Sequence, residues 1–164
     1  MTQLNQFKSN KKILIENVKI SQLKPVIDER GFLTEMMRSD DPDYKGFGQT
    51  YITSVNENVV KAWHYHEKQT DTFICVYGMI KLVLYDYRKE STTYGIVNEF
   101  FIGEKNSLRV QIPTRVMHGF KGISPVFSLV INMPDQLYNY ENPDEFRVHP
   151  HENDIPYDWS RKDG

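Results

Sequence analysis

The 164-residue sequence contains only one cysteine, Cys75. A lone cysteine cannot form an internal disulfide, so a disulfide-stapled secreted scaffold is excluded. Cys75 lies in the apolar run Phe73-Ile74-Cys75-Val76, which is typical of a small buried hydrophobic residue rather than a nucleophile. A reducing, cytoplasmic location is therefore expected.

Long hydrophobic runs and a charge of one sign are also absent. No apolar stretch approaches the roughly 20 residues of a membrane-spanning helix, and residues 1–10 lack the apolar centre of a signal peptide. The 20 basic and 22 acidic residues give a net charge of −2 without a basic stripe. Neither nucleic acid nor a membrane is an expected partner, and an anionic ligand would have to meet local cations.

The chain length and the spacing of apolar segments predict one all-β domain over residues 1–164. A chain of 164 residues with 39% hydrophobic content can bury one core but is short for two typical domains. Short runs rich in Val, Ile, Phe, Tyr and Thr alternate with turn signals, which favours a sandwich or barrel with little helix. The expected strands span 12–16, 48–55, 72–76, 79–87, 96–102, 107–112 and 126–132, with turns at 88–95, 103–106 and 113–119. Residues 138–164 are expected to form an irregular C-terminal tail.

Three histidines have an informative spacing. Alternation along an extended segment places His64 and His66 on one face. The series His-x-His-x4-Asp71-x6-Gly78, followed by Pro113-x4-His118, tracks the two-part pattern of cupins. The predicted fold class is therefore a cupin, a double-stranded β-helix or jelly-roll barrel.

Two chemistries fit this pattern. His64, His66, Asp71 and His118 could hold Zn, Fe, Mn or Ni. Alternatively, one neutral imidazole could act as a general base while a carboxylate fixes its tautomer. The spacing leaves both open, and an isolated histidine is more often only a hydrogen-bonded structural residue.

Four segments carry a resemblance to a known family. They are Asp28-Glu29-Arg30-Gly31-Phe32-Leu33-Thr34-Glu35, Gln49 at fifteen residues before His64, the run from Asp86 to Gly95, and Met117-His118-Gly119-Phe120. Together they resemble the dTDP-4-dehydrorhamnose 3,5-epimerase family, from Ile15 to Trp159. The resemblance implies an isomerase that needs no cofactor or metal. Its substrate would be a nucleotide-diphosphate keto sugar, and it would work as a homodimer.

The resemblance also assigns roles to individual residues. His64 would abstract a proton next to the sugar 4-keto group, and Asp163 would be the carboxylate partner of that histidine. His66 and Tyr140 are further candidate catalytic residues, Tyr140 as the acid, although no spacing selects this tyrosine. Substrate binding falls to Arg30, Phe32, Glu35, Gln49, Lys61, Arg88 and His118, the first three reaching into a neighbouring subunit.

Two residues of the family pattern are missing. The family's lysine would fall at Asp71 or Thr72, and its tyrosine at Ile131 or Asn132, so Tyr51 and Tyr138 are alternatives to Tyr140 as the acid. The His64-x-His66 pair is also similar to dTDP-sugar 3,4-ketoisomerases. A single-centre epimerase, a ketoisomerase, a metal-dependent cupin and a non-catalytic sugar-nucleotide binding module therefore stay open.

Overall fold

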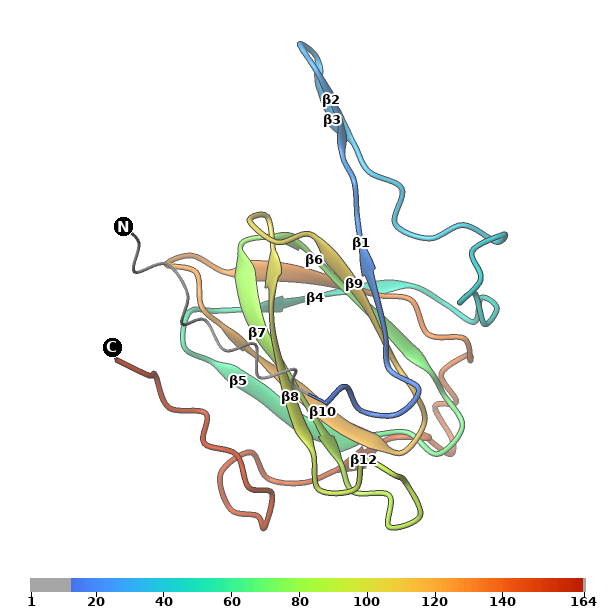
Figure 1. Cartoon of the computed structure of the whole chain (residues 1–164), viewed down its shortest axis with the longest axis vertical. Helices are drawn as coiled ribbons and strands as arrows, with labels where there is room; N and C mark the ends of the chain where they lie inside the picture. Colours follow the sequence, from blue (N-terminus) through green and yellow to red (C-terminus); the bar gives the residue numbers. More distant parts are fainter. Residues whose placement is uncertain (1–12, 164) are drawn as a thin grey trace, which may run out of the picture.

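Two five-stranded antiparallel sheets make up most of the fold in the computed structural model, which describes residues 13–163 (Figure 1). The first has the order β1 (Lys19–Gln22), β9 (Leu108–Ile112), β6 (Asp71–Tyr77), β11 (Ser128–Asn132) and β4 (Tyr51–Val55). The second has the order β12 (Phe146–Arg147), β5 (Val60–Tyr65), β10 (Val116–Gly122), β7 (Met79–Asp86) and β8 (Val97–Gly103). No helix occurs within residues 13–163, which confirms the all-β prediction.

The main core lies between the sheets, where the strands alternate inward and outward side chains. Phe73 and Cys75 of β6 face Leu82 and Leu84 of β7, and all four are buried in one cluster with Phe120. The burial of Cys75 confirms its predicted role as a core residue.

A second apolar cluster covers the outer face of the β5–β10–β7 sheet. The C-terminal segment crosses this face and buries Trp159 against Trp63, with ring centroids 4.9 Å apart. Lys121 Nζ donates to the Trp159 carbonyl at 2.9 Å. Residues 138–163 are irregular, as predicted, except for β12, which pairs with β5.

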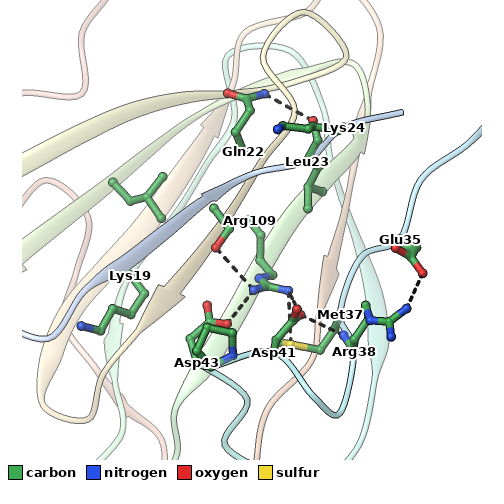
Figure 2. A pocket seen from close by; sticks show the side chains of 13 residues that line it. Lys19, Gln22, Leu23, Lys24, Glu35, Met37, Arg38, Asp41, Asp43 and Arg109 are labelled. Carbon is green, nitrogen blue, oxygen red and sulfur yellow. Dashed lines mark hydrogen bonds and ion pairs between the residues drawn. The ribbon is translucent and has the colours of Figure 1, made fainter. Parts of the chain in front are cut away.

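A buried arginine anchors the connection that leads to β4. Arg109 of β9 contacts Asp41 at 2.6 Å and Asp43 at 2.7 Å (Figure 2). It also donates to the Met36 carbonyl. The groove in Figure 2 is lined by this network and by β1, and none of the histidines lines it. The network therefore serves to hold residues 36–43 against the sheet.

The hairpin of β2 (Val26–Asp28) and β3 (Gly31–Leu33) projects away from the two sheets (Figure 1). Its turn requires Gly31, whose φ of 126° is accessible mainly to glycine. The large side chains of Val26, Ile27, Phe32 and Leu33 are exposed, Phe32 at 75%. This apolar surface has no partner within the described part of the chain.

The predicted turn at 113–119 is wrong in its second half, because β10 begins at Val116. Gly119 there reads as a turn signal, yet a Cβ at Gly119 would lie 2.2 Å from the Cβ of Ala62. The glycine permits a close approach of two strands instead.

The short strands β1, β2, β3, β5 and β12 were also not predicted. Residues 13–16 form no strand, and Lys12 lies outside the described residues. Among the described residues, no helix is long and apolar enough to cross a membrane.

Candidate active site

Neighbouring strands bring the predicted histidines together. His64 of β5 lies opposite His118 of β10, and their ring centroids are 4.0 Å apart. His66 follows the end of β5, 5.5 Å from His64 between ring centroids, and Asp71 begins β6 in the other sheet. Ligand atoms of the four residues all lie within 4.8 Å of one another. The predicted convergence of His64, His66, Asp71 and His118 is confirmed.

Asp71 is the centre of this cluster. Its Oδ2 lies 3.1 Å from Nε2 of both His66 and His118. Its Oδ1 accepts hydrogen bonds from Gln69 Nε2 at 2.7 Å and from Asn132 Nδ2 at 2.9 Å. Burial alone would raise the pKa of Asp71, but the contacts with His118 and His66 hold it well below its usual range. The carboxylate is therefore ionised although only 1% of the residue is exposed.

His64 differs from the other two histidines. It is partly exposed and makes no hydrogen bond to any residue between 13 and 163. The pKa of His64 lies well below its usual value, mainly because of burial and secondly because of the neighbouring His118. By contrast, Asp71 outweighs the effect of burial and raises the pKa of His66. His64 is thus a neutral imidazole near neutral pH, with a ring nitrogen available to accept a proton.

Four polar side chains from both sheets form a rim beside His64: Tyr51, Thr53, Lys61 and Arg147. In β4, Tyr51 and Thr53 alternate with residues that face outward. Their side chains therefore point to the same inward face as that of the core residue Val55. Lys61 Nζ spans the gap between the sheets and donates to Thr53 Oγ1 at 3.0 Å.

A β-bulge gives Lys61 its inward direction. Ala62 and Trp63 lie opposite the single residue Gly119, so Lys61 pairs with the core residue Phe120 while His64 pairs with His118. The extra residue lets both Lys61 and His64 face inward. Arg147 of β12 lies opposite His64 in the adjacent ladder and shares its face. Motif reasoning missed Arg147, because a two-residue strand leaves no pattern in the sequence.

Tyr51 is the tyrosine that reaches the cluster. Its hydroxyl accepts a hydrogen bond at 2.9 Å from Asn132, which in turn contacts Asp71. Burial and the charge of Asp71 raise the pKa of Tyr51 to about 12, so the phenol is protonated at neutral pH. Gln49 lies two residues before Tyr51 and accepts a 3.4 Å hydrogen bond from the Tyr138 amide.

Three predicted site residues lie elsewhere. Arg88 is buried in a bidentate pair with Asp86 and also donates to the Glu16 carbonyl at 3.0 Å. Asp163 is 82% exposed in its side chain and pairs with Arg161. Tyr140 is 88% exposed and packs against Tyr138. None of these contacts includes a histidine of the cluster, and the carboxylate that contacts the histidines is Asp71.

The remaining predicted binding residues lie on or after the projecting hairpin. Arg30 pairs with Asp28, Phe32 is exposed, and Glu35 pairs with Arg38. No contact between these residues and the histidines of the same chain occurs among the described residues.

Comparison with known proteins assigns the family. Residues 12–164 match the family described as dTDP-4-dehydrorhamnose 3,5-epimerase. The chain belongs to this family. It is accordingly a sugar epimerase of the isomerase class, with the cupin-type all-β fold that the histidine spacing predicted.

Individual relatives support this assignment over nearly the whole chain. A probable low-salt glycan biosynthesis epimerase, Agl13 of Haloferax volcanii, is 42% identical over 151 residues, covering 88% of this chain and 89% of the relative. The spore coat polysaccharide biosynthesis protein SpsL of Bacillus subtilis is 34% identical, covering 90% and 97%. The crystal structure of a dTDP sugar isomerase from Desulfovibrio desulfuricans G20 has a TM-score of 0.85 and 31% identity, covering 92% of this chain and 97% of that one.

The position of Arg88 generates a stability prediction. The pKa of Asp86 is about 2, because hydrogen bonds from Arg88, Ser91 and Thr93 outweigh its burial. A depressed folded-state pKa contributes stability that is complete above the unfolded pKa of about 3.9 and is lost as pH falls toward 2. We expect Arg88→Ala to lower the free energy of unfolding by about 3 kcal/mol at pH 7 and to flatten its decline between pH 4 and 2.

Chemical denaturation across this pH range measures the effect, with the exposed Arg161→Ala as the control. Nucleotide-sugar affinity should be unchanged in folded Arg88→Ala. A large affinity loss with normal stability would return Arg88 to the binding site.

Proposed function

We propose that this epimerase uses His64 to remove the proton next to the 4-keto group of a nucleotide-linked 6-deoxy sugar. The observation that carries the proposal is the state of His64, which is neutral, partly exposed and without a hydrogen-bond partner in the described chain, beside two buried histidines that are already engaged. An imidazole of this kind can take a proton at neutral pH. The printed roles of the relatives in glycan and spore coat polysaccharide biosynthesis support a product used in polysaccharide or glycan assembly.

Tyr51 is the acid we propose for returning the proton. It belongs to β4 in one sheet, whereas His64 belongs to β5 in the other, so the two residues approach the rim from different walls. Inversion at a carbon requires loss and return of the proton on opposite faces, which suits such an arrangement. Its pKa of about 12 keeps the proton on Tyr51 until a developing carbanion or enolate needs it.

Lys61 and Arg147 are the cations we propose for the anionic parts of the substrate. Lys61 is exposed on the rim, and among residues 13–163 the Arg147 side chain is held only by Glu145 at 2.7 Å, so both can be recruited by a diphosphate or an oxyanion. Gln49 completes the proposed binding residues of this chain, and His118, with both ring nitrogens engaged, supports Asp71 beside His64. We also propose that the enzyme is a single domain that works in the cytoplasm.

The first functional prediction concerns the base. His64→Asn should reduce exchange of the sugar C3 or C5 hydrogen with deuterated solvent by about 10²–10⁴-fold, because asparagine cannot accept the proton. Mass spectrometry of the recovered sugar measures the exchange, and calorimetry should show nearly unchanged nucleotide binding. His151→Asn, an exposed substitution in the C-terminal segment, is the control. Wild-type exchange in His64→Asn would rule out this base.

The second prediction separates two tyrosines. Tyr51→Phe should keep deuterium exchange on the face served by His64 while inversion falls by about 10²-fold, because the returning proton has lost its donor. Tyr140→Phe, at the position first assigned from the sequence, should leave both rates unchanged. NMR analysis of product configuration together with isotope content distinguishes them. Loss of inversion only in Tyr140→Phe would reverse the assignment.

The third prediction is a homodimer that uses the projecting hairpin. The exposed side chains of Val26, Ile27, Phe32 and Leu33 form an apolar surface that a second chain could bury. If the hairpin packs against a second chain, it would bring Arg30, Phe32 and Glu35 to the site of that chain, as the resemblance implies. Light scattering should give twice the chain mass, and Phe32→Asp should shift it toward the monomer and raise KM. A monomeric wild-type protein at assay concentration would remove the shared-site role.

A further inference from the structure

The hydrogen-bond roles of the buried histidines define a second feature of this site. His66 Nδ1 contacts the Asp144 carbonyl, and His118 Nδ1 lies 2.9 Å from the Val116 carbonyl. A carbonyl oxygen can only accept, so each Nδ1 carries a proton. In the neutral imidazole this leaves both Nε2 lone pairs directed at the same ionised oxygen, Asp71 Oδ2, at 3.1 Å.

One divalent cation fits between these three atoms. It would bond to His66 Nε2, His118 Nε2 and Asp71 Oδ2 together, and both nitrogens already lie 3.1 Å from that oxygen.

We propose that His66 Nε2, His118 Nε2 and Asp71 Oδ2 bind one divalent transition-metal ion of the Zn, Fe, Mn, Co or Ni class. Two imidazoles and one carboxylate are a ligand set that suits these ions. The fourth member of the cluster, His64, has its ligand atom within 4.8 Å of the others and would stay outside the set as the proposed base. Three protein ligands leave open positions for substrate.

The surroundings of these ligands match those of a built metal site. Metal-bound histidines commonly donate their other ring N–H to a backbone carbonyl, as His66 and His118 both do here. The second carboxylate oxygen of Asp71 is fixed by Gln69 and Asn132. The Asp144 side chain accepts from the amides of Glu67, Lys68 and Gln69, which fixes the loop between His66 and Asp71.

The cation would also account for the two departures from the family pattern. The resemblance places the missing lysine at 71 or 72 and the missing tyrosine at 131 or 132. Asp71 and Asn132 are hydrogen-bonded to each other at 2.9 Å, so the two replacements form one unit. If the proposed function holds, a metal ion here supplies the positive charge for the sugar oxyanion that the lysine would otherwise provide.

The experiment measures metal binding and proton exchange separately. Protein without a polyhistidine tag is stripped with a chelator and titrated with Co²⁺, whose absorption spectrum reports the ligands. We expect one Co²⁺ per chain, displaced by Zn²⁺, and at least about 100-fold weaker binding in His66→Asn and Asp71→Asn. His151→Asn is the matched control and should bind like the wild type. Thermal unfolding of each variant shows that it is folded, and Co²⁺ should raise the wild-type Tm.

Each outcome bears on one claim. Wild-type protein that binds Co²⁺ no more tightly than His66→Asn overturns the metal site, whether or not exchange activity is present. Reloading the stripped protein should restore deuterium exchange by at least about tenfold; equal exchange before and after reloading overturns the catalytic role of the ion. Co²⁺ binding without any exchange supports the site and instead overturns the proposed epimerase chemistry.

Discussion

A single ionised carboxylate buried between two sheets governs the geometry of this site. Asp71 begins β6 in the first sheet, yet it contacts His118 from β10 in the second sheet and Asn132 from the neighbouring strand β11. A buried charge is tolerated only when all its lone pairs are engaged. The sheets must therefore meet at a fixed separation at this point. Because His64 pairs with His118, its place follows from the same constraint.

The rim beside His64 shows how the barrel combines a packed core with an accessible polar edge. Further along the same inward faces lie Val55 and Phe120, which are buried. Toward the rim the positions are occupied by Tyr51, Thr53 and Lys61, so apolar packing gives way to side chains that water or substrate can reach. The bulge at Ala62 and Trp63 makes this change possible without disturbing the outer cluster around Trp159.

Local patterns predicted the parts of this site that depend on strand alternation. The His-x-His spacing, Asp71 and the Pro-x4-His segment carried enough information to predict the convergence of four side chains, since alternation is fixed by backbone geometry. The contacts of Arg88 lie beyond local patterns. Its motif resembles a binding segment, and the Glu16 carbonyl that it contacts lies 72 residues away in sequence. Arg147 and Tyr51 could not be selected either, because their roles depend on which strands become neighbours.

The second apolar cluster gives this enzyme a built-in optical reporter. The chain has two tryptophans, and both lie in that cluster with their rings in contact. Trp63 immediately precedes His64 in β5, whereas Trp159 belongs to the C-terminal segment. Tryptophan fluorescence therefore originates entirely on the reverse side of the strand that carries the histidine. Any detachment of the C-terminal segment changes that emission at the same place where it would loosen the backbone next to the site.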